Sequence, residues 1–337
     1  MSKVRLSLII AAAGAILASG MAQAEAKDAK TIAFMRAGPD PYYQYGMQAV
    51  EMAGKDLGVA VVTYSANNDS TQELANVQDA ITKGVDGILI YAVSLSSEKA
   101  AIAQAQKAGV PIFFQYGYDP SLLDKVAGFM QIDVFSFGDP VGEFVGNHVP
   151  TGEIGIISGK LGRGDAEAFS QGFKRGLAKS GSKATVVAEV PADFNRQMAL
   201  DAAAQMIAAH PDLKALYVHN DDMAVGASIA IDRAGKTGEI LLASGANGAP
   251  YGLDLIQQGK MTISYANPPS IASVEAFRLL ISVINGQSKA GQYYDAPSQM
   301  ITKENISEAM RWDPTPEQVS AWVKVPLPKP VVPAPAH

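Results

Sequence analysis

Few side chains in this sequence are suited to nucleophilic, redox or metal chemistry. The 337 residues include no cysteine, which excludes disulfides, thiolate nucleophiles and zinc–thiolate sites. Four histidines occur, and no two have H-x-x-x-H spacing: His148, His210, His219 and His337. A histidine metal site would therefore need ligands from distant parts of the chain. We expect no metal, no cofactor and no catalytic residue, and we predict that the protein is not an enzyme.

Two further segments could carry chemistry, and a simpler interpretation is favoured for both. Asp165 and Glu167 could act as an acid and a base, but neighbouring loop carboxylates are usually only solvated. The glycine-rich segment 159–164 lacks the spacing of a dinucleotide-binding turn and the ending of a phosphate loop, which favours a flexible loop. An exported sugar hydrolase or isomerase stays as an alternative, although no carboxylate pair or metal site supports it convincingly.

The first 24 residues have the pattern of a secretory signal peptide. Lys3 and Arg5 precede the apolar stretch Leu6–Ala18, and Ala22-Gln23-Ala24 has small residues where a cleavage site needs them. The apolar stretch is shorter than the roughly 20 residues of a spanning helix. We expect cleavage after about Ala24 and a location in the periplasm.

The remaining sequence alternates between short apolar runs and segments with helical periodicity. Uninterrupted runs such as Gly87–Ala92 and Ile112–Gln115 are typical of parallel strands covered on both faces. Ser70 and Glu73 have the spacing of a capping box, which predicts a helix start at Ser70. The alternation resumes after Asp133, so the sequence predicts an α/β protein with two doubly wound, Rossmann-like lobes.

The composition limits the partners. Apolar residues make up 48% of the chain and charged residues 18%, which allows a substantial core. The 27 basic and 33 acidic residues give a net charge of −6, which argues against nucleic-acid binding because that requires a basic face. The proline-rich segment 326–337 is expected to be an extended tail.

Three stretches occur in a characteristic order and spacing. They are Asp40-Pro41-Tyr42-Tyr43, then Glu73–Asp79 with Gly84–Ile90, and then Pro191–Phe194 leading through His210-Pro211-Asp212 to Asn220–Gly226. Together they resemble the periplasmic sugar-binding proteins of ABC importers, in particular the ribose-binding type, over about residues 30–300. Repressors of the lactose-repressor type share that fold, but they begin with a DNA-reading helix-turn-helix where this chain has its leader.

The resemblance implies two lobes joined by three crossing strands, with the ligand in the cleft between them. It divides the chain into a signal peptide (1–24), an N-terminal lobe (30–132 and 268–296), a C-terminal lobe (133–267 and 297–325) and the tail. Pro268 and Pro269 suit the second crossing, because a residue before proline favours extended backbone.

The resemblance also implies a ligand site. Aromatic rings can cover the apolar faces of a sugar, and amides and carboxylates can bind its hydroxyl groups. The positions that correspond to the site are Asp40, Tyr42, Tyr43, Gln115, Tyr116, Asp133, Glu167, Phe194, Asn220, Asn247 and Asn267. Ordinary roles compete with ligand contact: half-buried core packing for the aromatics, a helix N-cap for Asn220 and an Asp-Pro turn for Asp40.

The sequence departs from the family pattern in charge. The Asp-Arg pair that the family has after its fourth strand corresponds to Tyr116-Gly117, beside Gln115, and a second pocket arginine falls near Glu167. Asn247 stands where the family often has aspartate. The family's asparagine after the first crossing corresponds to Val134, beside Asp133. Arg36 could supply a substitute charge or could lie at the surface. This pattern argues against a pocket tuned for ribose. It ranks neutral monosaccharides and polyols first, amino sugars second and anionic sugars last.

We therefore expect a monomeric solute-binding protein that closes by a hinge over one small carbohydrate. The carbohydrate would be delivered to an ABC permease in the inner membrane. The same cleft could instead present the carbohydrate to a chemoreceptor or another signalling partner, and the sequence does not separate these two functions.

Overall fold

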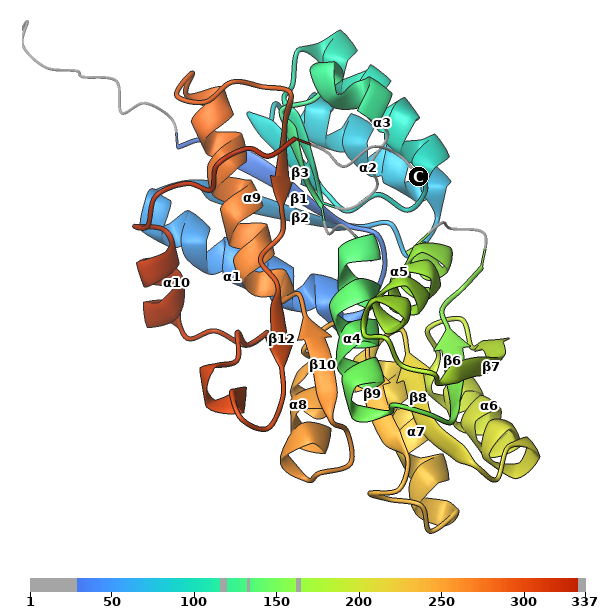
Figure 1. Ribbon diagram of the computed structural model, residues 1–337. Coiled ribbons are helices and arrows are strands. Elements are labelled where there is room, and N and C mark those ends of the chain that lie inside the picture. Colours follow the sequence, from blue (N-terminus) through green and yellow to red (C-terminus); the bar gives the residue numbers. More distant parts are fainter. Residues whose placement is uncertain (1–28, 116–119, 132–133, 162–164, 333–337) are drawn as a thin grey trace, which may run out of the picture.

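The protein is a two-lobed α/β molecule (Figure 1). The structure, a computed structural model, describes residues 29–115, 120–131, 134–161 and 165–332. The expected signal peptide and two expected site residues, Tyr116 and Asp133, lie outside these ranges. Each lobe has a six-stranded sheet, with strand order β11-β5-β4-β3-β1-β2 in the first lobe and β12-β10-β9-β8-β6-β7 in the second. The pairings are parallel except for β12, which runs antiparallel to β10.

The first sheet lies between two layers of helices. Its strands are β1 (Thr31–Arg36), β2 (Ala60–Ser65), β3 (Gly87–Ile90), β4 (Ile112–Gln115), β5 (Gly128–Gln131) and β11 (Gln292–Asp295). Its helices are α1 (Pro41–Leu57), α2 (Ser70–Thr82), α3 (Leu95–Ala108), the 3-10 helix η1 (Pro120–Lys125) and α9 (Pro269–Ile284). Helices α1 and α9 pack on one face and α2 and α3 on the other, so β3 and β4 are wholly buried, as their continuous apolar sequences predict.

The second sheet is covered in the same way. Its strands are β6 (Glu153–Ser158), β7 (Thr185–Pro191), β8 (Leu213–Val218), β9 (Leu241–Ser244), β10 (Ile263–Ala266) and β12 (Gln299–Ile301). Helices α4 (Val134–His148) and α5 (Asp165–Lys179) cover one face, and α6 (Arg196–Ala209), α7 (Asp221–Arg233) and α8 (Pro250–Gln257) cover the other. Two doubly wound lobes are therefore confirmed.

Helices α4 and α5 approach each other closely because glycines face the contact. A Cβ atom on Gly142 would lie 2.0 Å from the carbonyl oxygen of Phe173. One on Gly176 would lie 1.9 Å from the carbonyl oxygen of Asp139. Both separations are far below van der Waals contact, so this packing requires glycine at the two positions.

The chain passes between the lobes three times, between β5 and α4, between β10 and α9, and between β11 and β12. It then passes between the lobes a fourth time and returns to the first lobe. After the 3-10 helix η2 (Ile306–Glu308), helix α10 (Pro316–Trp322) packs against α1 and α9 (Figure 1). The backbone N–H of Val331 finally donates to the carbonyl of Tyr293 in β11, at 2.9 Å.

This return corrects two expectations for the C-terminal segment. Residues 297–325 were assigned to the C-terminal lobe, but residues 316–322 form a helix on the first lobe because Val319 buries its side chain there. Within the segment expected to be a tail, Val331 pairs with Tyr293 of β11, so this part of it is bound to the first lobe. The other lobe boundaries stay a prediction.

The expected capping box at Ser70 is also wrong. Helix α2 begins at Ser70, but its N-cap is Asp69, whose Oδ1 accepts from the N–H groups of Thr71 (2.7 Å) and Gln72 (3.2 Å). Glu73 is buried instead, and its Oε2 accepts from the N–H of Val93 at 2.6 Å. No helix in the described part of the chain is long and apolar enough to cross a membrane.

Candidate functional site

Most of the expected site residues lie where strands of the two sheets end. Doubly wound sheets bind ligands at the carboxyl ends of their strands. In the first lobe, Arg36 and Gln115 end β1 and β4, and Asp40 precedes α1. In the second lobe, Phe194, Asn220, Asn247 and Asn267 follow β7, β8, β9 and β10 in turn.

The first turn of α1 carries two of the expected aromatic residues. Asp40 is the N-cap of this helix, and its Oδ1 accepts from the N–H of Tyr42 at 2.7 Å. The rings of Tyr42 and Tyr43 meet edge to face at 5.8 Å, and Tyr43 also packs on Tyr91, with centroids 5.0 Å apart. Tyr42 is buried and Tyr43 is half-buried, so Tyr43 is the more accessible of the two rings.

Partial desolvation raises the pKa of Asp40, and the carboxylate of Asp222 in the second lobe raises it further. Asp222 forms an ion pair with Arg196 at 2.6 Å, and the guanidinium of Arg196 lies 5.5 Å from the centre of the Tyr251 ring. Both lobes therefore contribute a carboxylate to the same neighbourhood.

Asn267 joins the two lobes at the second crossing. Its Nδ2 donates to the hydroxyl of Tyr42 at 3.1 Å, and its backbone N–H donates to the carbonyl of Asn247 at 3.1 Å. Hydrogen bonds thus connect three expected site residues in series: Tyr42 of the first lobe, Asn267 at the crossing and Asn247 of the second lobe. Asn267 is nearly fully buried, so this series of hydrogen bonds is part of the lobe junction.

Hydrogen bonds to Asp221 hold the loop that carries Asn247. The Oδ2 of this fully buried carboxylate accepts from the N–H of Ala249 at 2.7 Å, and its Oδ1 accepts from the hydroxyl of Ser264 at 2.8 Å. The same hydroxyl accepts from the N–H of Gly248 at 3.2 Å. Burial raises the pKa of Asp221 to about 6, although these hydrogen bonds favour its ionised form.

Asn220 has the structural role that competed with ligand binding. It is the N-cap of α7, and its Oδ1 accepts from the N–H of Met223 at 2.9 Å. The cap occupies only the oxygen, because the Nδ2 group has no role in it. Asn220 is half-buried, so its amide N–H groups can still serve a ligand.

Phe194 follows β7 in the left-handed backbone region, with φ of +57°. Asp193 before it has φ of +51°, and residues other than glycine rarely adopt such values outside turns and functional sites. The turn places the phenyl ring directly over Gly159, where a Cβ atom would lie 2.0 Å from the Cζ of Phe194. Gly159 follows β6, so the ring lies across the end of that strand.

A buried histidine supports this part of the site. The Nδ1 of His219 accepts from the N–H of Gly159 at 2.9 Å, so the proton of the neutral ring is on Nε2, which lies 3.0 Å from Ser170 Oγ. Ser170 donates to Glu189 at 2.6 Å. Burial lowers the pKa of His219 to about 3, against the opposing effect of the carboxylates of Glu189 and Glu167. Glu167, in the first turn of α5, is thus in the same part of the second lobe.

Several buried polar atoms at the strand ends have no partner in the described residues. Both amide atoms of Gln115 are unpaired although its side chain is only 1% exposed. The same holds for the Oε1 of Gln131 at the end of β5, the Oγ of Ser158 at the end of β6 and the Oδ1 of Asn247. An unpaired buried polar group costs about 1–3 kcal/mol. Such atoms at the carboxyl ends of strands in both sheets are suited to hydrogen bonds with a polar ligand.

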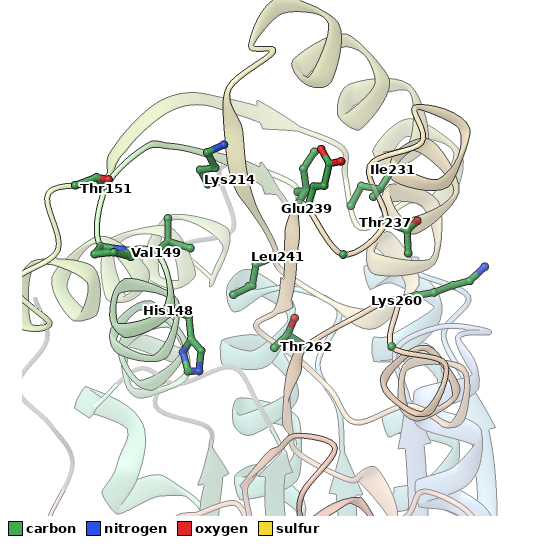
Figure 2. Close-up of a pocket in the computed structure, with 14 residues that line it drawn as sticks. His148, Val149, Thr151, Lys214, Ile231, Thr237, Glu239, Leu241, Lys260 and Thr262 are labelled. Carbon is green, nitrogen blue, oxygen red and sulfur yellow. The ribbon is translucent and has the colours of Figure 1, made fainter.

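The described residues hold no group of three or more side chains that could bind a metal ion. A pocket of about 440 Å³ lies elsewhere, at the amino-terminal edge of the second sheet. Lys214, Glu239 and Thr262 are among the residues that line it (Figure 2). Because the strand ends that carry the expected residues are at the opposite edge, this pocket is separate from the candidate site.

Five residues that belong to the junction or support it were not among the predicted site residues: Tyr91, Gln131, Ser158, Asp221 and Trp312. Gln131 and Ser158 end strands, and Tyr91 directly follows one. The tendency of doubly wound sheets to bind ligands at the carboxyl ends of their strands could therefore have identified them. Asp221 adjoins Asn220 in the same motif. Trp312 has no such signal, because it reaches the junction only through the fourth passage of the chain.

Comparisons with known proteins agree with this architecture. The D-allose-binding periplasmic protein of Escherichia coli (strain K12) is 29% identical over 251 residues, covering 72% of this chain and 80% of that protein. The xylitol-binding protein of Mycolicibacterium smegmatis (strain ATCC 700084 / mc(2)155) is 26% identical over 310 residues, covering 89% of this chain and 86% of that protein.

A solved structure shares the fold at lower identity. The periplasmic solute-binding protein of an ABC transporter from Actinobacillus succinogenes 130z, with bound D-allose, superposes with a TM-score of 0.77 at 22% identity. The alignment covers 83% of this chain and 100% of that one. The family model described as a periplasmic binding protein domain matches residues 32–288, which is most of the chain. This chain belongs to the periplasmic binding protein family.

Proposed function

We propose that this protein is exported to the periplasm, binds one small carbohydrate between its lobes and delivers it to an ABC permease in the inner membrane. The observation that carries the proposal is the set of unpaired buried polar atoms at the ends of strands from both sheets. These atoms suit a ligand with many hydroxyl groups. Aromatic rings near the ends of strands in both lobes, such as those of Tyr43 and Phe194, suit the apolar faces of a sugar ring.

The expected contacts come from both lobes, so a bound ligand would favour the closed arrangement. Asp40, Tyr43 and Gln115 would hold the ligand from the first lobe, and Phe194, Asn220 and Asn247 from the second. Tyr42, Asn267, Tyr116, Asp133 and Glu167 complete the proposed site. A ligand that touches both lobes binds the closed arrangement more tightly than the open one and shifts the population toward it. The relatives are binding proteins, and we propose no catalysis.

The charges at the junction favour neutral ligands. Asp40 and Asp222 face the same neighbourhood from opposite lobes, and the guanidinium of Arg196 is already paired with Asp222. An anionic sugar would meet this negative potential, with Arg36 as the remaining candidate for a balancing charge. Neutral monosaccharides and polyols therefore rank above amino sugars, and sugar acids rank last.

A thermal-shift screen tests the proposal. The panel contains D-ribose, D-allose, xylitol, myo-inositol, D-glucosamine and D-glucuronate. These compounds are similar in size but differ in charge and in whether they form a ring or an open chain. A ligand at 100 times its dissociation constant adds about 2.7 kcal/mol of stability. We expect a neutral sugar or polyol to raise the melting temperature and to remain chemically intact. No shift with any member, or a shift with D-glucuronate alone, would contradict the proposed ligand class.

Export has its own test. The full chain would be expressed in a Gram-negative host, and the periplasmic fraction would be examined by amino-terminal sequencing. We expect a mature protein that begins at Glu25. Retention of Met1 in the cytoplasmic fraction would exclude export.

A further inference from the structure

Trp312 is bonded to both lobes at once. Its backbone carbonyl accepts from the hydroxyl of Ser270 in the first turn of α9, which covers the first sheet. Its indole Nε1–H donates to the carbonyl of Asn247 at 3.0 Å, in the loop that follows β9 of the second sheet. The side chain is 1% exposed, so these bonds lie inside the lobe junction.

The indole ring also packs against the candidate site. It meets the ring of Tyr42 edge to face at 5.3 Å and the ring of Tyr45 at 5.7 Å. Tyr42 accepts from Asn267, and the backbone N–H of Asn267 donates to the same Asn247 carbonyl that Trp312 binds. Trp312, Tyr42, Asn267 and Asn247 thus form a closed ring of contacts, in which one carbonyl receives two donors.

The chain is anchored on both sides of Trp312. Two residues earlier, the N–H of Met310 donates to the side chain of Gln299 in β12 at 3.0 Å, which ties the segment to the second sheet. A few residues later, α10 packs on α1 and α9 of the first lobe, as the C-terminal ribbon in Figure 1 shows. A rotation of the lobes therefore cannot leave both bonds of Trp312 unchanged.

We propose that Trp312 is a positioning residue, which holds Asn247 and Tyr42 in place for the carbohydrate and couples the fourth passage of the chain to the opening of the lobes. The inference rests on the proposed function. Trp312 acts through its two neighbours, because its own ring is enclosed by protein.

The chain offers a matched control, since it contains only two tryptophans. Trp322 lies in α10 on the first lobe and is half-buried. Trp312→Phe keeps an aromatic ring and removes the indole donor, Trp312→Ala removes both, and Trp322→Phe makes the matched change away from the junction. Each single variant to phenylalanine also leaves one tryptophan as the sole indole fluorophore.

The first measurement needs no sugar. Hydrogen exchange would be followed at the backbone amides of residues 245–249 and 267 in the wild type, Trp312→Phe and Trp322→Phe. We expect faster exchange at these amides in Trp312→Phe alone, because the Asn247 carbonyl loses one of its two donors. Equal exchange in the three proteins would contradict the proposal.

The second measurement uses the panel sugar that stabilises the wild type most. Calorimetry should show that Trp312→Phe binds it about two- to tenfold more weakly, the effect of one neutral hydrogen bond, and that Trp312→Ala binds it more weakly still. Trp322→Phe should bind it as the wild type does. The sugar should change the emission of Trp322→Phe, where Trp312 remains, and leave that of Trp312→Phe unchanged.

The outcomes separate the two proposals. If the wild type binds a sugar and Trp312→Phe binds it equally well, the positioning role is wrong while the proposed function stands. Faster exchange with unchanged affinity also contradicts the positioning role, since the loop would then move without consequence for the ligand. If the wild type binds no member of the panel, the proposed function fails and the positioning role fails with it.

Discussion

At the scale of single residues, several side chains have a structural role and a proposed ligand role together. Asn220 and Asp40 are both N-caps, and each uses one oxygen for its helix. Capping fixes the rotamer of the side chain, so its remaining polar atoms point in a defined direction before any ligand arrives. A substitution to alanine would therefore lower both the stability of the protein and its affinity for the ligand, and the two effects could not be separated.

Asn220→Ser separates these roles. Serine caps helices about as well as asparagine, so the melting temperature should change little, but serine lacks the amide N–H groups. We expect sugar affinity to fall roughly 5- to 150-fold, the equivalent of about 1–3 kcal/mol for a buried partner left unsatisfied. Isothermal titration calorimetry measures the affinity. Asn220→Ala, as the comparison, should lose stability as well. Native affinity in Asn220→Ser would remove Asn220 from the site.

His219 makes stability depend on pH in a definite direction. Its pKa is about 3 in the folded protein, whereas an exposed histidine has about 6.5, so the unfolded chain binds the proton more readily between these values. Its contribution is complete above pH 6.5 and is lost as the pH falls, by roughly 2 kcal/mol at pH 5.

Urea unfolding at pH 7 and pH 5 measures this contribution. The decrease in unfolding free energy should be smaller in His219→Gln than in the wild type. His148→Gln is the matched control, because His148 is exposed and lies at the end of α4, away from His219. The same decrease in His219→Gln as in the control would show that His219 is not the titrating group.

At the scale of elements, the parts that sequence analysis found were those with strong local patterns. Strand β4 has the predicted bounds and β3 begins at the predicted Gly87, because an uninterrupted apolar run defines each of them. Strands β5, β11 and β12 and helix α10 were missed. They are short, and their pairing with distant segments, such as β11 with β5, decides their conformation more than their own residues do.

The contact between α4 and α5 gives an element-scale test. Helix propensity alone predicts that alanine stabilises an interior helix position by about 1 kcal/mol relative to glycine. The structure predicts the opposite sign for Gly142→Ala and Gly176→Ala, because each new methyl group would overlap a carbonyl of the facing helix. Chemical denaturation should show destabilisation by about 1–3 kcal/mol for each variant. A gain in stability would mean that the two helices are farther apart than described.

At the scale of the whole molecule, the site depends on how the lobes meet rather than on either lobe alone. The family resemblance named the proposed site residues from sequence, and several of them follow strands of the two sheets, where doubly wound folds bind ligands. It could not show that Asp40 and Asp222 approach each other across the junction, or that Trp312 enters it. Those contacts depend on the relative placement of the lobes and on where the C-terminal segment goes after β12.

Truncation tests the importance of the C-terminal return. A chain that ends at Asp313 loses α10, the burial of Val319 and the bond from Arg278 to the carbonyl of Val325. Fully burying one large apolar side chain contributes about 1.5–3 kcal/mol, so calorimetry should show a clearly lower melting temperature. A chain that ends at Val332 is the control and should melt like the full chain. Equal melting of both truncations would show that the return adds nothing to stability.

The order in which the chain visits its lobes also bears on how it would emerge under the proposed export. Strands β1–β5 come first, yet the face that α9 covers waits for residues 269–284, and β11 follows only at residue 292. The second lobe, in contrast, is nearly contiguous between residues 134 and 266 and lacks only its antiparallel edge strand. A chain that left a translocon from its amino end would therefore keep the part of the first sheet that α9 covers exposed, beside α1, until the second lobe had emerged. The first lobe to appear is the last to be completed.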